Sequence, residues 1–95
     1  MITVAANGLL AKGRGTLDAT KLSLGSGATL QLKSSGWDST YAYISNPLTV
    51  GANRTVLIGM SGGDGSMTFS SVIFAGGRYE LAYGQGGSNN EVWFT

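Results

Sequence analysis

The sequence predicts an all-β domain with little or no helix, built of hairpins that form a sandwich or a small barrel. Three observations support this fold class. Short runs of residues alternate between apolar and polar, which is typical of half-buried strands. Sixteen glycines among 95 residues interrupt these runs, and each would destabilise a helix by about 1 kcal/mol. No window of about a dozen residues keeps a helical periodicity without containing a glycine.

Ten strands are predicted in chain order, from alternation or from enrichment in Val, Ile, Tyr and Phe. Pro47 follows Asn46 between two of them and predicts a turn or a strand edge. The alternation within residues 66–75 changes parity at Ser70-Ser71, which predicts a bulge or a switch between two sheets. The predicted strands are Ile2–Ala6, Leu9–Lys12, Lys21–Leu24, Ala28–Lys33, Thr40–Ser45, Leu48–Val50, Thr55–Met60, Ser66–Ala75, Arg78–Tyr83 and Glu91–Phe94.

A nine-residue pattern occurs four times, as I-T-V-A-A-N-G-L-L from Ile2, L-S-L-G-S-G-A-T-L from Leu22, L-T-V-G-A-N-R-T-V from Leu48 and V-I-F-A-G-G-R-Y-E from Val72. We interpret the four copies as hairpins of one design. Their similarity reflects either a duplicated unit or the features that all hairpins share. The turn of each copy needs a backbone with positive φ, which Gly and Asn tolerate best. The residues expected there are Asn7, Gly27, Asn53 and Gly77.

The stretch S-G-G-D-G-S-M-T-F, Ser61 to Phe69, is either a ligand-binding loop or the tip of a hairpin. A phosphate loop requires a Lys and a following helix, and neither is present. A calcium loop of the EF-hand type requires several more oxygen ligands than Asp64 alone. Asp64-Gly65 is a favoured pair for a two-residue hairpin turn. We therefore predict a hairpin tip.

The length and composition indicate one domain, residues 1–95. The chain has no Cys, hence no disulfide or thiolate zinc site, and no His, the commonest general base and metal ligand. We therefore expect no metal and no cofactor. Charged residues make up 12% of the chain and the net charge is +1. Because proteins of near-zero net charge tend to associate, we expect the chain to work within an assembly.

The sequence also argues against an enzyme, a nucleic-acid-binding protein and a membrane protein. The carboxylates are not paired at short spacing and the chain has no His to activate a serine, so we predict that the protein is not an enzyme. The cations are scattered and the net charge is low, so we expect no nucleic-acid partner. Apolar runs are much shorter than the roughly 20 residues of a membrane helix. The first ten residues lack a basic region, so we expect neither a membrane partner nor a signal peptide.

Aromatic residues offer one candidate ligand site. Trp37 lies in the loop-like segment S-S-G-W-D-S-T, next to Asp38, and Tyr41 and Tyr43 share one face of the following strand. An exposed aromatic ring beside polar groups can stack on a sugar and bond its hydroxyl groups. The alternative is that the two tryptophans, Trp37 and Trp93, belong to the core or to a protein interface.

The composition and pattern of the chain resemble those of small virion proteins of tailed bacteriophages, namely head decoration (cement) proteins and fibre or spike modules. The resemblance lies in a short, Met-initiated, all-β chain rich in Gly, Ser, Thr and Asn without Cys or His, and includes L-T-V-G-A-N-R-T-V and the Gly-rich turns. It implies a non-enzymatic structural protein of the virion that binds neighbouring capsid subunits as a homo-oligomer, with a trimer favoured. No diagnostic motif is present, so no functional residue is carried over.

Two functional hypotheses follow. In the first, a capsid decoration protein adds its edge strands to the sheet of a neighbour, with Ile2, Val4, Trp93 and Phe94 as interface residues. In the second, the protein is a carbohydrate-binding module, lectin-like or receptor-binding, whose site contains Trp37, Asp38, Tyr41 and Tyr43. The composition also allows a third, an inhibitor that docks on a host protein.

Overall fold

The computed structural model describes residues 1–32, 40–59, 66–81 and 90–95. The all-β class with almost no helix is confirmed: sheets pack against one another, and the one helical element described is a single 3-10 turn. The elements are β1 (Ile2–Val4), β2 (Leu9–Ala11), β3 (Gly15–Asp18), η1 (Ala19–Lys21), β4 (Leu22–Leu24), β5 (Thr29–Gln31), β6 (Thr40–Ser45), β7 (Leu48–Val50), β8 (Thr55–Ile58), β9 (Met67–Phe69), β10 (Val72–Phe74), β11 (Gly77–Leu81) and β12 (Asn90–Phe94).

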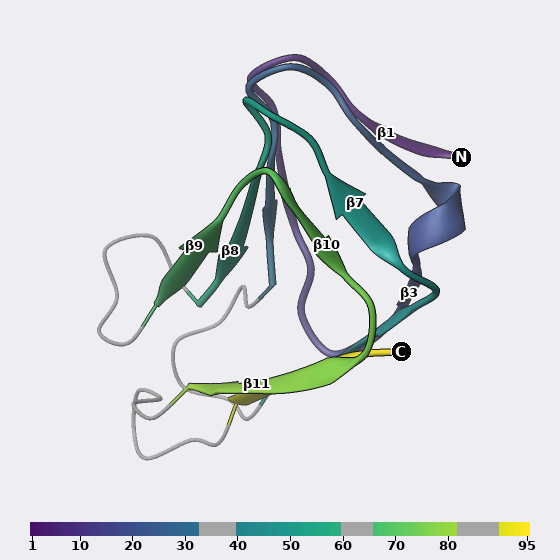
Figure 1. Cartoon of the computed structure of the whole chain (residues 1–95), viewed down its shortest axis with the longest axis vertical. Helices are drawn as coiled ribbons and strands as arrows, with labels where there is room; N and C mark the ends of the chain where they lie inside the picture. Colours follow the sequence, from purple (N-terminus) through teal and green to yellow (C-terminus); the bar gives the residue numbers. More distant parts are fainter. Residues whose placement is uncertain (33–39, 60–65, 82–89) are drawn as a thin grey trace.

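The chain winds in successive coils around a roughly triangular cross-section, so the strands of one coil lie behind those of the next in Figure 1. The first coil contains β1, β2 and β3, and the second contains β4, β5 and β6. Equivalent strands of neighbouring coils pair in parallel: β1 with β4, β2 with β5 and then β8, and β3 with β6. The molecule is therefore a short β-solenoid in this part of the chain.

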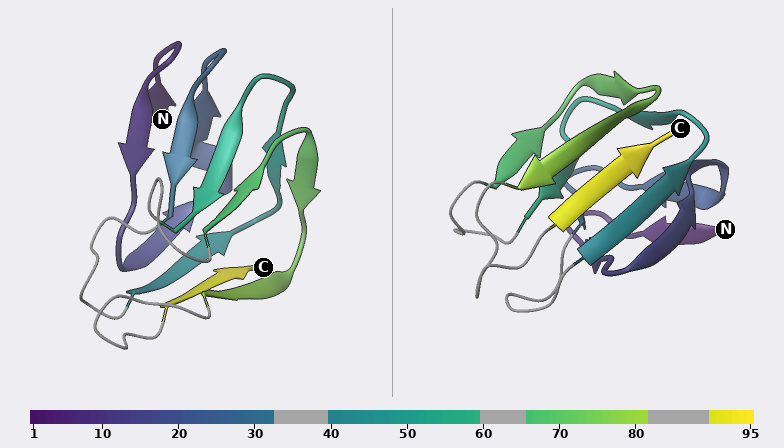
Figure 2. Two further views of the ribbon diagram at one scale, coloured as in Figure 1. Left: turned by 90° about the vertical axis from the view of Figure 1, so that its left-hand side faces the viewer. Right: turned by 90° about the horizontal axis from the view of Figure 1, so that it is seen from below.

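The chain reverses its direction after β8. Strand β9 pairs antiparallel with β8, β10 pairs antiparallel with β7, and β11 pairs antiparallel with β12. The C-terminal strand β12 then runs parallel to β6 and lies between β6 and β11, as the right-hand view of Figure 2 shows. A reversed coil made of β9, β10 and β11 thus follows the forward coils, and β12 completes the sheet beside them.

The prediction of four hairpins is wrong for the repeated segments. The two strands of each of the first three copies do not pair with each other; they pair with the equivalent strands of the neighbouring copy, as in Ile2↔Leu22 and Leu9↔Thr29. Each copy is a corner between two walls, because its turn directs the second strand along a different face. Among the described strands, antiparallel pairs of consecutive strands occur later, at β8–β9 and β11–β12. The tip predicted at Asp64-Gly65 lies outside the described residues.

The prediction for the repeated turns is confirmed. The backbone has positive φ at Asn7 (61°), Gly27 (77°), Asn53 (59°) and Gly77 (112°). In the first two copies the turn closes with a hydrogen bond, from Gly8 N to Ala5 O at 2.8 Å and from Ala28 N to Gly25 O at 3.0 Å. A four-residue turn with positive φ at its third position but not at its second is of type II, which requires Gly or Asn at the third position.

The core lies inside the triangle and receives side chains from all three walls. A cluster of aromatic rings fills the end formed by the reversed coil. Phe74 and Phe94 stack with ring centroids 4.2 Å apart, and the rings of Phe69 and Tyr79 meet Phe74 edge-on. The fully buried aliphatic side chains are Leu30, Leu32, Ile44, Val50, Val56, Ile58 and Val92.

One wall is divided, because β4 and β7 do not pair although they occupy the same place in successive coils. Arg54, at the corner after β7, spans this division. Its Nε donates to the carbonyl oxygen of Leu24 at 3.1 Å, and its Nη1 donates to that of Ala52 at 3.0 Å. A side chain thus satisfies a backbone acceptor at the end of β4.

Candidate interaction surface

The four-stranded sheet β3–β6–β12–β11 has one buried and one exposed face. Successive side chains of a strand point to opposite faces of the sheet. Phe94 is accordingly buried, with 2% of its surface exposed, whereas its neighbour Trp93 is 38% exposed. Tyr43 is 44% exposed, while Ala42 and Ile44 on either side of it are buried. The exposed face therefore carries two large aromatic side chains.

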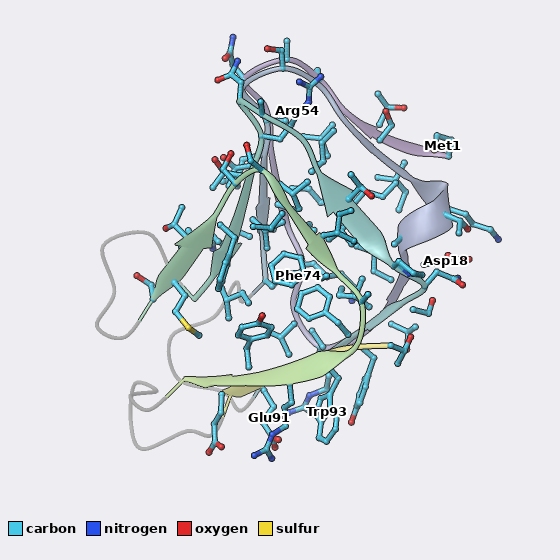
Figure 3. All side chains as sticks on the ribbon, viewed as in Figure 1. Met1, Asp18, Arg54, Phe74, Glu91 and Trp93 are labelled. Atoms are coloured by element: carbon cyan, nitrogen blue, oxygen red, sulfur yellow. The ribbon has the colours of Figure 1, made fainter. Side chains whose placement is uncertain are left out.

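These aromatic residues lie in one row across the sheet. The strand register places Thr16 opposite Tyr43, Tyr43 opposite Trp93, and Trp93 opposite Arg78. Residues directly opposite on neighbouring strands have side chains within contact range. We call Thr16, Tyr43, Trp93 and Arg78 the aromatic row. In Figure 3, Trp93 and Glu91 point away from the core beneath the sheet.

Arg78 holds the edge of the aromatic row in place. Its guanidinium carbon lies 5.5 Å from the centre of the Trp93 ring, within the range of a cation–π interaction. Its Nη1 donates to Glu91 Oε1 at 2.9 Å, and its Nη2 lies 3.5 Å from Glu80 Oε2. Each exposed ion pair contributes little to stability, but three partners together restrict the guanidinium. The Arg78 guanidinium in turn restricts the Trp93 ring that it contacts.

The fold brings together two carboxylates that the sequence spacing did not indicate. Glu80 and Glu91 are direct cross-strand neighbours, and Arg78 contacts both. Both carboxylates thus act as ion-pair partners of one cation on an open sheet face. The arrangement offers hydrogen-bond acceptors beside aromatic rings, which is chemistry suited to binding.

The predicted interface residues divide between surface and core. Ile2, 44% exposed in β1, and Trp93 lie at the surface. Val4 and Phe94 are buried, with 7% and 2% of their surfaces exposed, so their side chains stabilise the core and are not presented to a partner. Trp93 and Phe94 are consecutive in one strand and therefore cannot both face outward.

The predicted sugar-binding residues are only partly placed. Tyr43 belongs to the aromatic row, and Tyr41 lies in β6 with Glu91 as its backbone partner. Trp37 and Asp38 lie outside the described residues. The structure thus places Tyr43, from the predicted sugar-binding site, opposite Trp93, from the predicted interface. Arg78, Glu80 and Glu91 were not predicted as site residues. A signal was present, because residues two positions apart in a strand share a face. This spacing relates Arg78 to Glu80 and Glu91 to Trp93.

Within the described ranges, no group of three or more acidic, His or Cys side chains is arranged to hold a metal ion. None of the helical residues described there forms a segment long and apolar enough to cross a membrane. Comparison with known protein families, with curated proteins and with solved structures found no match.

Proposed function

We propose that the protein is a non-enzymatic structural protein that binds a neighbouring protein subunit through the aromatic row. One observation carries the proposal: Trp93, Tyr43 and Arg78 lie side by side on an exposed sheet face. Trp, Tyr and Arg are the residue types that most often dominate the binding energy of protein interfaces. The polar groups around them, Glu80 and Thr16, suit the rim of such an interface.

The kind of assembly is suggested by the sequence. The resemblance to small phage virion proteins favours a capsid decoration protein that works in the virion as a homo-oligomer, with the capsid protein as its partner. The low net charge of +1 supports association. Attachment of such a protein would stabilise the shell by mass action, since it binds only the assembled state.

The first test is the absolute mass in solution, measured by light scattering over a concentration series. We expect a defined oligomer, with a trimer favoured, that dissociates when Trp93→Ala removes the central ring of the row. Ile73→Ala is the matched control, because Ile73 is 66% exposed on β10, outside the row. A wild-type chain that stays monomeric at every concentration and does not bind phage capsids would contradict the proposal.

A carbohydrate-binding module is the second candidate, and a specific observation favours it. Tyr43 and Trp93 are cross-strand partners on the exposed face and offer a stacking platform, and Glu80 and Glu91 supply acceptors for hydroxyl groups. The test is tryptophan fluorescence of the Trp37→Phe variant, in which Trp93 is the remaining indole. A saturable change on adding sugars, lost in Tyr43→Ala, would favour this function over subunit binding.

A further inference from the structure

The first coil leaves the apolar interior open at one end of the solenoid. Leu10 is only half-buried, although Leu30 and Val56, its partners in the next two coils, are fully buried. Ile2, on the same face of β1 as the buried Val4, is 44% exposed, and Leu9, on the outer face of β2, is 59% exposed. The terminal repeat of a solenoid normally needs a polar cap. The open end therefore has apolar surface that a partner can cover.

The strands of the first coil also present unpaired backbone groups. Val4 O accepts from Gly25 N at 2.8 Å and Lys12 N donates to Gln31 O at 2.7 Å, so these residues bond toward the second coil. In a parallel ladder, alternate residues bond to the same side. Thr3 and Ala11 therefore direct their N–H and C=O groups to the opposite, outer edge. No described strand pairs with that edge.

The charge of this coil is positive. Lys12 and Arg14 lie in the first coil and Lys21 follows it in η1, against a single carboxylate, Asp18. Asp18 already accepts hydrogen bonds from Thr20 and from Asn46. Lys12 precedes β3 and Lys21 follows it, so cations flank one of the open strands at both ends. Lysines near an edge strand oppose pairing with a second copy, because like charges would meet.

We propose that the open edge of the first coil binds an acidic edge strand of a partner protein by strand addition and rejects a second copy of the same edge. Opposite charges steer the partner to the edge, backbone hydrogen bonds extend the walls of the solenoid, and Ile2 and Leu9 contribute apolar contacts. This surface is separate from the aromatic row, so the proposal goes beyond subunit binding through that row.

The test uses a charge-reversed copy of the chain as the acidic probe. Lys12→Glu and Lys21→Glu are combined, and Arg14 is left unchanged. Lys12→Glu also removes the hydrogen bond from Lys12 Nζ to Arg14 O, and the Lys12→Gln control described below lacks the same bond. Its partner in the test is the basic chain, which keeps Lys12 and Lys21. Both the probe and the basic chain carry Tyr43→Ala and Trp93→Ala, which removes association through the aromatic row. We expect each to be monomeric alone and their mixture to form a one-to-one complex by light scattering. Its dissociation constant should rise at least about tenfold at high salt.

Two control probes separate charge from strand pairing. Adding Thr3→Pro and Ala11→Pro to the probe removes the outward N–H groups and should abolish the complex, since proline is tolerated where an edge N–H faces solvent. Lys12→Gln with Lys21→Gln should bind the basic chain at least about tenfold more weakly than the acidic probe does. Circular dichroism must first show that each probe is folded. A mixture of monomers, a complex that survives the prolines, or a basic chain that dimerises alone would each overturn the proposal.

Discussion

The side chain of Asn7 occupies the space that a Cβ atom on Gly27 would need, because the turns of the first two coils stack on one another. Gly27 also has a φ of +77°. We predict that Gly27→Ala lowers the free energy of unfolding by about 2–4 kcal/mol, from backbone strain and from the collision together. Urea denaturation followed by circular dichroism measures the change.

A matched glycine separates the two causes. Gly76 has a φ of +84° and nothing within 4 Å of a built Cβ, so Gly76→Ala should lower the free energy of unfolding only by the backbone cost of about 1–2 kcal/mol. Adding Asn7→Gly to Gly27→Ala should restore about 1–2 kcal/mol, because the collision is removed. Equal losses for Gly27→Ala and Gly76→Ala would show that the stacked turns do not interact.

The hydrogen bonds to Asp18 predict that the protein loses stability in acid. Hydrogen bonds from Thr20, through its hydroxyl group and its backbone N–H, and from Asn46 lower the pKa of this carboxyl below its ordinary value. A pKa that is lower in the folded state stabilises the fold above the unfolded pKa. That stability is lost as the pH falls below about 4. Melting temperatures measured from pH 7 to pH 2.5 should show the difference between wild type and Asp18→Asn shrinking in this range.

Asn46→Gly is the control for that pH dependence. It removes one donor to Asp18 Oδ1 but keeps the positive φ of 66° accessible. We expect its acid transition to begin at a higher pH than that of the wild type, because the pKa of Asp18 rises toward its ordinary value. Wild-type and Asp18→Asn curves that stay parallel down to pH 2.5 would contradict the role of Asp18.

Arg54 should stabilise the fold at the place where β4 and β7 do not pair. Its Nε donates to Leu24 O at 3.1 Å where no strand pairing satisfies that carbonyl. We expect Arg54→Met to lower the free energy of unfolding by about 1–2 kcal/mol, because a backbone acceptor loses a charged donor. Arg54→Lys keeps the charge without the planar donor group and should lose about half as much. Chemical denaturation in urea measures both changes, and an unchanged Arg54→Met protein would show that water serves equally well.

Local features of the fold could be predicted from the sequence because they depend on neighbouring residues. The strands Thr40–Ser45 and Leu48–Val50 have the predicted bounds. The chain changes sheets where predicted, at Ser71, which has a φ of 55° and lies between β9 and β10. Pro47 lies in the connection between β6 and β7. Turn residues and the apolar–polar alternation therefore predicted where these strands begin and end.

The pairing of strands could not be predicted from the same patterns. A type II turn between two alternating runs suits a hairpin, but it also suits a corner between stacked coils, and the choice depends on contacts between residues 20 or more positions apart, such as Leu9 and Thr29. The strand β3, Gly15–Asp18, was not predicted because it has a single buried apolar residue, Leu17. Parallel pairing with β6 makes it a strand.

The candidate surface was partly predictable for a related reason. Trp93 and Tyr43 were expected at binding sites because of their residue types, and both are exposed. That they lie side by side depends on β12 inserting next to β6, which no local pattern indicates. Arg78 gains its role in the same way, since its partner Glu91 comes from the neighbouring strand.

The consecutive residues Trp93 and Phe94 allow stability and binding to be separated. Phe94 stacks on Phe74 in the core with centroids 4.2 Å apart, so Phe94→Ala should lower the free energy of unfolding by about 3–5 kcal/mol. Trp93→Ala removes an exposed ring and its contact with Arg78, and should cost about 1 kcal/mol or less. Trp93→Ala should nevertheless abolish association in light scattering, whereas any Phe94→Ala protein that remains folded should still associate, because its outer face is intact. A large loss of stability in Trp93→Ala would assign that ring to the core and remove the basis of the aromatic row.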